Sequence, residues 1–94
     1  MIYRLHFKIE ARKEWDKLDS SIRKIFKKHL TERLNNPHNP TSRLSGMEDC
    51  YKIKLRQAGY RLVYQVRDEV LIVIVIAVGK RERNAVYKKA IKRI

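Results

Sequence analysis

Residues that cross-link a fold or interrupt its helices and strands are few: the 94 residues include one cysteine, three glycines and two prolines. A single cysteine, Cys50, excludes an internal disulfide, so the reducing cytoplasm is the expected location. The longest apolar run, residues 70–78, has nine residues. A helix of that length is too short to cross a bilayer, and the first ten residues contain no continuous apolar stretch of the signal-peptide type. We therefore expect a cytoplasmic protein.

Acidic residues are also scarce. The sequence has ten Asp and Glu residues but 23 Lys and Arg residues, which gives a net charge of +13 and a pI near 10.2. The excess is uneven, because residues 1–49 hold eleven basic and seven acidic side chains, whereas residues 50–94 hold twelve and three. So much positive charge predicts a polyanionic partner. Nucleic acid is the first expectation and an acidic protein the second. A membrane surface ranks last, because the second half is predicted as strands rather than one basic amphipathic helix.

Motifs for metals and nucleotide cofactors are missing. The sequence contains no CxxC, no HExxH, no glycine-rich phosphate loop and no paired carboxylates. Metal and nucleotide cofactors are therefore not expected. The three histidines, His6, His29 and His38, fall on different predicted elements, so the usual histidine pair of a ribonuclease is not expected either.

Hydrophobic periodicity divides the first half into a strand and two helices. Apolar residues make up 44% of the chain, enough for one core, and residues 1–94 are predicted to form a single domain. Residues 2–9 alternate as a strand, and Ala11, Trp15 and Leu18 form one helical stripe. Asp19 to Ser21 break that helix and can cap a second one over residues 21–35. The core stripe of the second helix consists of Ile22, Ile25, Phe26, Leu30 and Leu34, and Arg33 is expected to point outward.

The second half changes to the period of a sheet. Pro37 and Pro40 end the helical region, and a short strand near Arg43 is weakly indicated. Strands are predicted over residues 50–56, 60–66 and 70–78, the last apolar on both faces and therefore central. A final helix is predicted from Glu82 onward. The fold class is therefore α+β: an N-terminal strand and a helical hairpin packed on a mainly antiparallel sheet, with a C-terminal helix.

The strand predicted over residues 50–56 has one apolar face and one cationic face. Because side chains alternate along a strand, Tyr51, Ile53 and Leu55 share the core face, and Lys52, Lys54 and Arg56 share the other. In the next strand, Arg61 joins the cationic face. The central strand delivers Lys80, Arg81 and Arg83 to one end of the sheet, and Tyr87 of the last helix can lean over it. The predicted result is a concave basic surface with one aromatic.

Such a surface can be a solubility coat or a phosphate site. Like charges on neighbouring strands repel and destabilise a sheet, so a fold that keeps them is expected to use them on phosphates. Attack of an RNA 2′-hydroxyl on its own phosphate builds negative charge, which fixed cations stabilise. Lys54, crowded by Lys52 and Arg61, is expected to have a lowered pKa and so to accept the 2′-hydroxyl proton.

At these residues the sequence resembles a known family. The segments "RLSGMEDCYKIKLRQAGYRLVYQV" and "VIAVGKRERNAVYKKAIKRI", together with "ARKEWDKLDSSIRK", are similar to the RelE family of bacterial toxins. The resemblance spans nearly the whole chain and implies a single RelE-like domain with a microbial-ribonuclease-like α+β fold. It implies a ribosome-dependent mRNA interferase that cuts mRNA in the ribosomal A site, inhibits translation, and leaves a 2′,3′-cyclic phosphate and a 5′-hydroxyl.

The resemblance also implies roles and partners. The family's catalytic residues fall on Lys52, Lys54, Arg61, Arg81 and Tyr87. Lys54 would accept the proton, Lys52 and Arg61 would hold the phosphate, Arg81 would neutralise the leaving oxygen, and Tyr87 would orient the nucleotide. Further contacts to RNA or ribosome are expected from Arg43, Arg56, Lys80, Arg83 and Lys88. Ser45 stands where relatives can carry a basic residue. The implied partners are the ribosome with its mRNA and a RelB-like antitoxin, with operator DNA contacted only through the antitoxin complex.

Two other functions fit parts of the pattern. A toxin of the ParE kind, which poisons DNA gyrase, shares the fold but generally lacks this set of basic residues. A non-catalytic RNA- or ribosome-binding protein fits the size and the pI alone.

Overall fold

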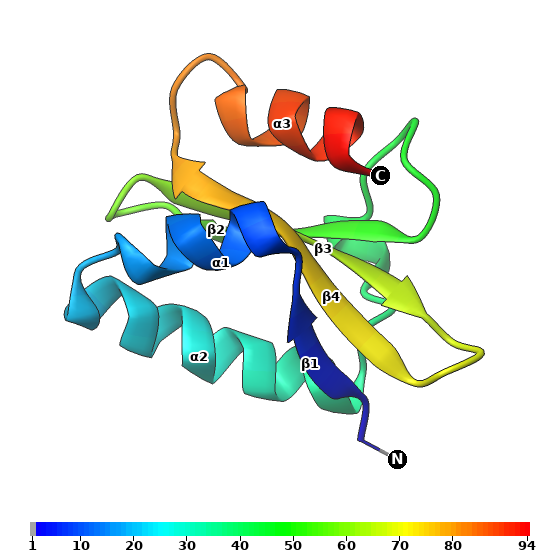
Figure 1. Ribbon diagram of the computed structural model, residues 1–94. Coiled ribbons are helices and arrows are strands. Elements are labelled where there is room, and N and C mark those ends of the chain that lie inside the picture. The colour runs from blue at the N-terminus through cyan, green and yellow to red at the C-terminus, as the bar shows by residue number, and fades with distance from the viewer. Residues whose placement is uncertain (1) are drawn as a thin grey trace.

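The computed structural model describes residues 2–94 and contains four strands and three α-helices in the predicted order (Figure 1). The elements are β1 (Arg4–Phe7), α1 (Ile9–Asp16), α2 (Ser20–Asn35), the 3₁₀ turn η1 (Pro40–Ser42), β2 (Cys50–Leu55), β3 (Tyr60–Arg67), β4 (Ile72–Lys80) and α3 (Ala85–Arg93). The α+β class is confirmed. Among residues 2–94, no helix has both the length and the apolar character needed to span a membrane.

The four strands form one sheet in the order β1-β4-β3-β2. β1 runs parallel to β4, whereas β2, β3 and β4 form an antiparallel meander. The apolar strand is therefore central, as predicted, but it runs over residues 72–80 rather than 70–78, so Gly79 lies within it. The strand indicated near Arg43 is reduced to a single bridge between Arg43 and Tyr51. β2 remains an edge strand.

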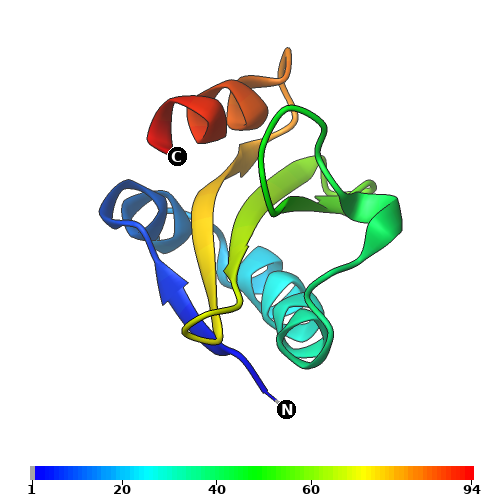
Figure 2. The ribbon, with the colours of Figure 1, turned by 90° about the vertical axis from the view of Figure 1, so that its right-hand side faces the viewer.

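Helices α1 and α2 cover one face of the sheet, and α3 covers the other (Figure 2). The larger of two hydrophobic cores lies between these two helices and the sheet. In it, Trp15 and Phe26 pack against the predicted apolar face of β2 and β3. A β-bulge in the β3–β4 pairing leaves Ile76 without a partner in β3. Ile76 and Ala77 both face α3, where Val86 and Ala90 cover them. Packing on both faces explains why β4 is apolar throughout.

Helix α2 begins at an Asp cap. The Asp19 carboxylate accepts a hydrogen bond from the backbone N–H of Ser21 at 3.2 Å, as the sequence predicts. Two expectations for this helix are wrong. Ile25 is 42% exposed rather than part of the core. Arg33 does not point outward, because its guanidinium reaches over the sheet edge to Tyr64.

Candidate active site

A hollow lies at the end of the sheet where β4 leads into α3. Its lining residues come from β2, β3, β4, the connection 81–84 and α3: Lys54, Arg61, Lys80, Arg81, Glu82, Asn84, Ala85, Val86 and Tyr87. We call it the basic hollow. Its volume is about 170 Å³, below the roughly 300–1,000 Å³ of clefts that enclose drug-sized ligands. It therefore suits a phosphate with its immediate neighbours rather than an enclosed nucleotide.

The floor of the basic hollow is a cross-strand pair of cations. Lys54 on β2 lies opposite Arg61 on β3 in the antiparallel register, so both side chains project from the same face. Arg61 is only 8% exposed. Its guanidinium donates to the backbone oxygen of Tyr60 at 2.9 Å, and among residues 2–94 it takes part in no ion pair. A buried cation without a carboxylate favours an anion in the hollow.

The β2–β3 turn fixes the backbone of Arg81 beside this floor. Gly59 adopts a left-handed conformation, with φ of +73°, which a glycine tolerates best. The Gly59 carbonyl accepts a hydrogen bond from the Arg81 backbone N–H at 2.7 Å. The turn between β2 and β3 therefore also fixes the backbone position of Arg81, at the start of the connection to α3.

The start of α3 turns the chain sharply over the basic hollow. The predicted start at Glu82 is wrong, because α3 begins at Ala85 after two residues with positive φ, Arg83 at 46° and Asn84 at 59°. Asparagine adopts this conformation more readily than most residues. The reversal places Tyr87 in the wall of the hollow. The Tyr87 hydroxyl is buried and has no hydrogen-bond partner among residues 2–94, so a ligand that offers one would relieve an energetic cost.

The electrostatics of the basic hollow act most clearly on Lys54. The positive charge of Lys52 lowers the pKa of Lys54, and desolvation and the charges of Arg56 and Arg61 lower it further. The direction predicted from the sequence is confirmed. A lowered pKa increases the fraction of neutral amine near neutral pH, and a neutral amine can accept a proton.

The predicted site residues divide into three groups. Five of them line the basic hollow: Lys54, Arg61, Lys80, Arg81 and Tyr87. Lys52 and Arg56 do not, and line a neighbouring hollow that shares Lys54. The remaining cations, Arg43, Arg83 and Lys88, are exposed and line neither.

Some residues of the site are not predicted from the sequence. Asn84 belongs to no chemical motif, and the only signal in the sequence is that asparagine adopts a left-handed conformation more readily than most residues. Arg33 looked like a surface residue of α2 and instead lines the neighbouring hollow. No histidine lines the basic hollow: His38 contacts Tyr51 and Asp68, each at 2.8 Å, away from it. Among residues 2–94, no cluster of His, Cys, Asp or Glu is arranged to hold a metal ion.

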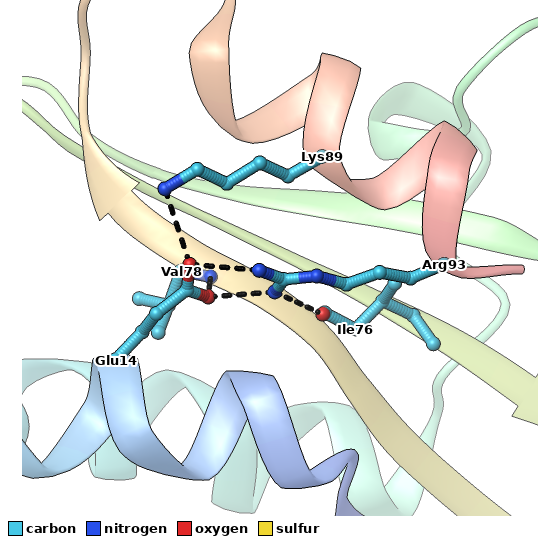
Figure 3. A network of polar contacts seen from close by, with 5 residues as sticks. All are labelled: Glu14, Ile76, Val78, Lys89 and Arg93. Atoms are coloured by element: carbon cyan, nitrogen blue, oxygen red, sulfur yellow. Dashed lines mark hydrogen bonds and ion pairs between the residues drawn. The ribbon is translucent and has the colours of Figure 1, made fainter.

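An ion-pair network holds α3 against α1 and β4 (Figure 3). Tyr87 belongs to α3, so the network also holds Tyr87 in place. Glu14 of α1 accepts from both terminal nitrogens of Arg93, at 2.8 and 3.1 Å, and from Lys89 at 3.2 Å. Its carboxylate also accepts from the Val78 backbone N–H, and Arg93 donates to the Ile76 carbonyl at 3.0 Å. One carboxylate therefore connects α1, β4 and α3.

Replacing Glu14 with glutamine should lower the free energy of unfolding by about 2 kcal/mol at neutral pH, between the values for exposed and buried ion pairs. Burial acts to raise the pKa of the Glu14 carboxyl, but hydrogen bonds from Arg93, Val78 and Lys89 together hold it below its ordinary value of 4.5. The stabilisation is therefore complete above pH 4.5 and is lost as the pH falls through the lower, folded-state pKa.

Denaturant titrations of parent and Glu14→Gln protein between pH 3 and 7 measure this effect. The stability difference should shrink toward the acid end. Glu32→Gln changes an exposed α2 residue that forms no ion pair within residues 2–94. It is the matched control and should follow the parent. A constant difference across this range would contradict the role assigned to the Glu14 charge.

Comparison with known proteins identifies the family. The family described as ParE toxin of type II toxin-antitoxin system, parDE, matches residues 5–85. The mRNA interferase toxin RelE of Escherichia coli (strain K12) is 57% identical over 94 residues, which cover 100% of this chain and 99% of that protein.

Solved structures agree with the sequence comparison. The R81A/R83A mutant of the E. coli toxin RelE in the free state has a TM-score of 0.92 and 55% identity, covering 100% of this chain and 99% of that one. The same mutant in complex with a peptide of the antitoxin RelB covers the same shares, with a TM-score of 0.84 and 55% identity. The chain therefore belongs to the RelE/ParE family of toxins of type II toxin–antitoxin systems, and within it to the RelE toxins.

Proposed function

We propose that this protein is the toxin of a type II toxin–antitoxin system and acts as a ribosome-dependent mRNA interferase. It cuts mRNA in the ribosomal A site through attack of a ribose 2′-hydroxyl on the neighbouring phosphate. The products are a 2′,3′-cyclic phosphate and a 5′-hydroxyl end. The reaction as proposed uses no metal and no cofactor. Its site of action is the cytoplasm, where the ribosomes are.

The observation that carries this proposal is the cross-strand pair of Lys54 and Arg61 on the floor of the basic hollow. Lys54, with its lowered pKa, removes the 2′-hydroxyl proton. Arg61 stabilises the charge that builds on the phosphate, and Arg81 stabilises the leaving 5′-oxygen. Arginine remains protonated in proteins, so the contribution of Arg81 is electrostatic rather than proton donation, and the leaving 5′-oxygen takes its proton from water. Tyr87 orients the nucleotide, and its hydroxyl gains the partner it lacks.

Dependence on the ribosome follows from the weakness of lysine as a base. Without a strong base the reaction requires a 2′-hydroxyl already in line with the scissile bond, and alignment of this kind can supply several kcal/mol of a reaction barrier. The ribosome would hold the mRNA in that geometry. The predicted cations that line neither hollow, Arg43, Arg83 and Lys88, would contact RNA of the ribosome or the mRNA.

Cleavage mapping tests the proposal. Purified protein is mixed with programmed ribosomes or with the same mRNA free in solution, and the new 5′ ends are located. We expect discrete cuts within the A-site codon on ribosomes and very little cleavage of free RNA. Comparable rates on the two substrates would falsify the ribosome dependence, and no cleavage of either would overturn the enzymatic function.

A second candidate, a gyrase poison, is favoured by one observation, the match to the family described by the ParE toxin. The cations of the basic hollow and the 57% identity to an mRNA interferase favour RNA cleavage instead. Brief expression separates the candidates: cut mRNA indicates an interferase, DNA damage indicates a gyrase poison, and neither indicates a non-catalytic RNA- or ribosome-binding protein.

The proposed regulatory partner is a RelB-like antitoxin. A chain with a charge of +13 invites an acidic segment that folds on binding, and relatives have been solved together with RelB. We expect the antitoxin to cover or displace α3 with Tyr87, or to neutralise the basic hollow. Contact with operator DNA would then occur only through the complex. A complex that leaves Lys54, Arg81 and Tyr87 open and arranged as in the free toxin would contradict this expectation.

A further inference from the structure

A second hollow lies beside the basic hollow, and Lys54 belongs to both. It follows the outer edge of β2 and is lined by Arg33, Thr41, Ser42, Lys52, Lys54 and Arg56. We call it the edge hollow. Four of its six residues are cations, the other two carry hydroxyls, and none is acidic. Among residues 2–94, no ion pair neutralises any of the four cations.

Arg33 is held in place at the edge hollow. One terminal nitrogen of its guanidinium donates to the Tyr64 hydroxyl at 2.8 Å and to the Lys52 carbonyl at 3.3 Å, and the other donates to the Ser42 hydroxyl at 3.2 Å. Tyr64 is buried and itself donates to the Pro37 carbonyl at 2.8 Å. A guanidinium has five N–H donors, so these three bonds leave donors available for a ligand.

This arrangement is typical of a pre-organised anion site. A long side chain normally loses rotamer freedom when it binds, at about 0.5–1.5 kcal/mol each, but Arg33 is already ordered. The planar guanidinium also matches phosphate oxygens better than a lysine does. The edge hollow therefore offers one fixed guanidinium, three further cations and two hydroxyls to a single negatively charged group.

We propose that the edge hollow binds the RNA phosphate next to the scissile one on the same strand, with Arg33 as its fixed ligand. The inference rests on the proposed function. Because Lys54 lines both hollows, a strand whose scissile phosphate lies in the basic hollow passes a neighbouring phosphate along the edge of β2. An acidic antitoxin segment is the other possible occupant, but only the RNA strand has its reacting group fixed beside Lys54.

The test removes single charges from the mRNA. Programmed ribosomes receive mRNA in which the linkage on either the 5′ or the 3′ side of the cut is an uncharged methylphosphonate, one position for each mRNA. For the parent protein, one of the two replacements should lower the cleavage rate about tenfold, as expected for loss of a hydrogen bond to a charged group. Arg33→Gln should be about tenfold slower on ordinary mRNA and lose nothing further on that modified mRNA.

Two further variants keep the test sharp. Lys24→Gln makes the same charge change at an exposed position of α2 that lines neither hollow, and it should behave as the parent does. Arg56→Gln, which lines the edge hollow, should show the same coupling to the methylphosphonate. It keeps the inference testable if Arg33→Gln loses stability through Tyr64, which thermal unfolding would show.

The contrary outcomes are distinct. If both methylphosphonates slow Arg33→Gln and Arg56→Gln as much as the parent, the inference is overturned. Weaker binding of an acidic antitoxin peptide to Arg33→Gln would then assign the edge hollow to the antitoxin. A parent protein that leaves ordinary mRNA on ribosomes uncut overturns the proposed function, and the inference with it.

Discussion

Lys54→Ala protein should cut ribosome-bound mRNA about 10²- to 10⁴-fold more slowly than the parent, the range that a general base contributes. Because the base must be neutral, the parent rate should rise with pH through the pKa of Lys54. That pKa lies below the ordinary lysine value of 10.5, chiefly because of the charge of Lys52. Single-turnover rates between pH 6 and 9 on programmed ribosomes measure both effects. Lys54→Ala should lack the rising limb.

Two matched variants separate a base from a simple cation. Lys54→Arg keeps the positive charge but cannot give up its proton, so it should be nearly as slow as Lys54→Ala. Lys52→Gln removes the main cause of the lowered pKa, so its rising limb should move to higher pH. A Lys54→Arg protein with parental rate and parental pH profile would refute the base role and leave Lys54 as an electrostatic residue.

The cationic floor of the site is the part of the structure that could be predicted best. Alternation along two short strands places Lys54 and Arg61 on one face, and a tight turn at Gly59 makes those strands antiparallel neighbours. Both rules are local, because the side-chain period and the hairpin act over a few residues. The central position of β4 could also be predicted, because a strand that is apolar on both faces must be covered on both sides.

The walls of the site could not be predicted in this way. The start of α3 depends on positive φ at Arg83 and Asn84, and for an arginine this conformation is set by tertiary contacts rather than by propensity. The bond between Glu14 and Arg93 joins residues 79 positions apart. The periodicity of apolar residues carries no information about a contact between residues so far apart in the sequence.

Arg33 shows a different limit. A charged residue in a helical pattern is assigned to the solvent face, and most such assignments are correct. Here the guanidinium finds three acceptors at the sheet edge, so the residue serves both the fold and the edge hollow. Side-chain length, which a hydrophobic pattern ignores, makes this possible.

We expect that Arg61 lowers the stability of the fold while it contributes to catalysis. The residue is 8% exposed and lies opposite Lys54, and no carboxylate pairs with it among residues 2–94. Replacing it with methionine keeps most of the apolar stem and removes a desolvated charge. We expect the free energy of unfolding to rise by about 1 kcal/mol while cleavage of ribosome-bound mRNA falls about 10²- to 10³-fold, as when one stabilising donor is lost.

Denaturant titration and single-turnover cleavage on the same preparations measure the two effects of Arg61→Met. Arg67→Met is the matched control, because Arg67 lies on the same strand but is exposed and outside the basic hollow. It should leave both quantities near the parental values. An Arg61→Met protein that is less stable than the parent would mean that Arg61 supports the fold. Its burial would then no longer argue that the basic hollow is built to receive a phosphate.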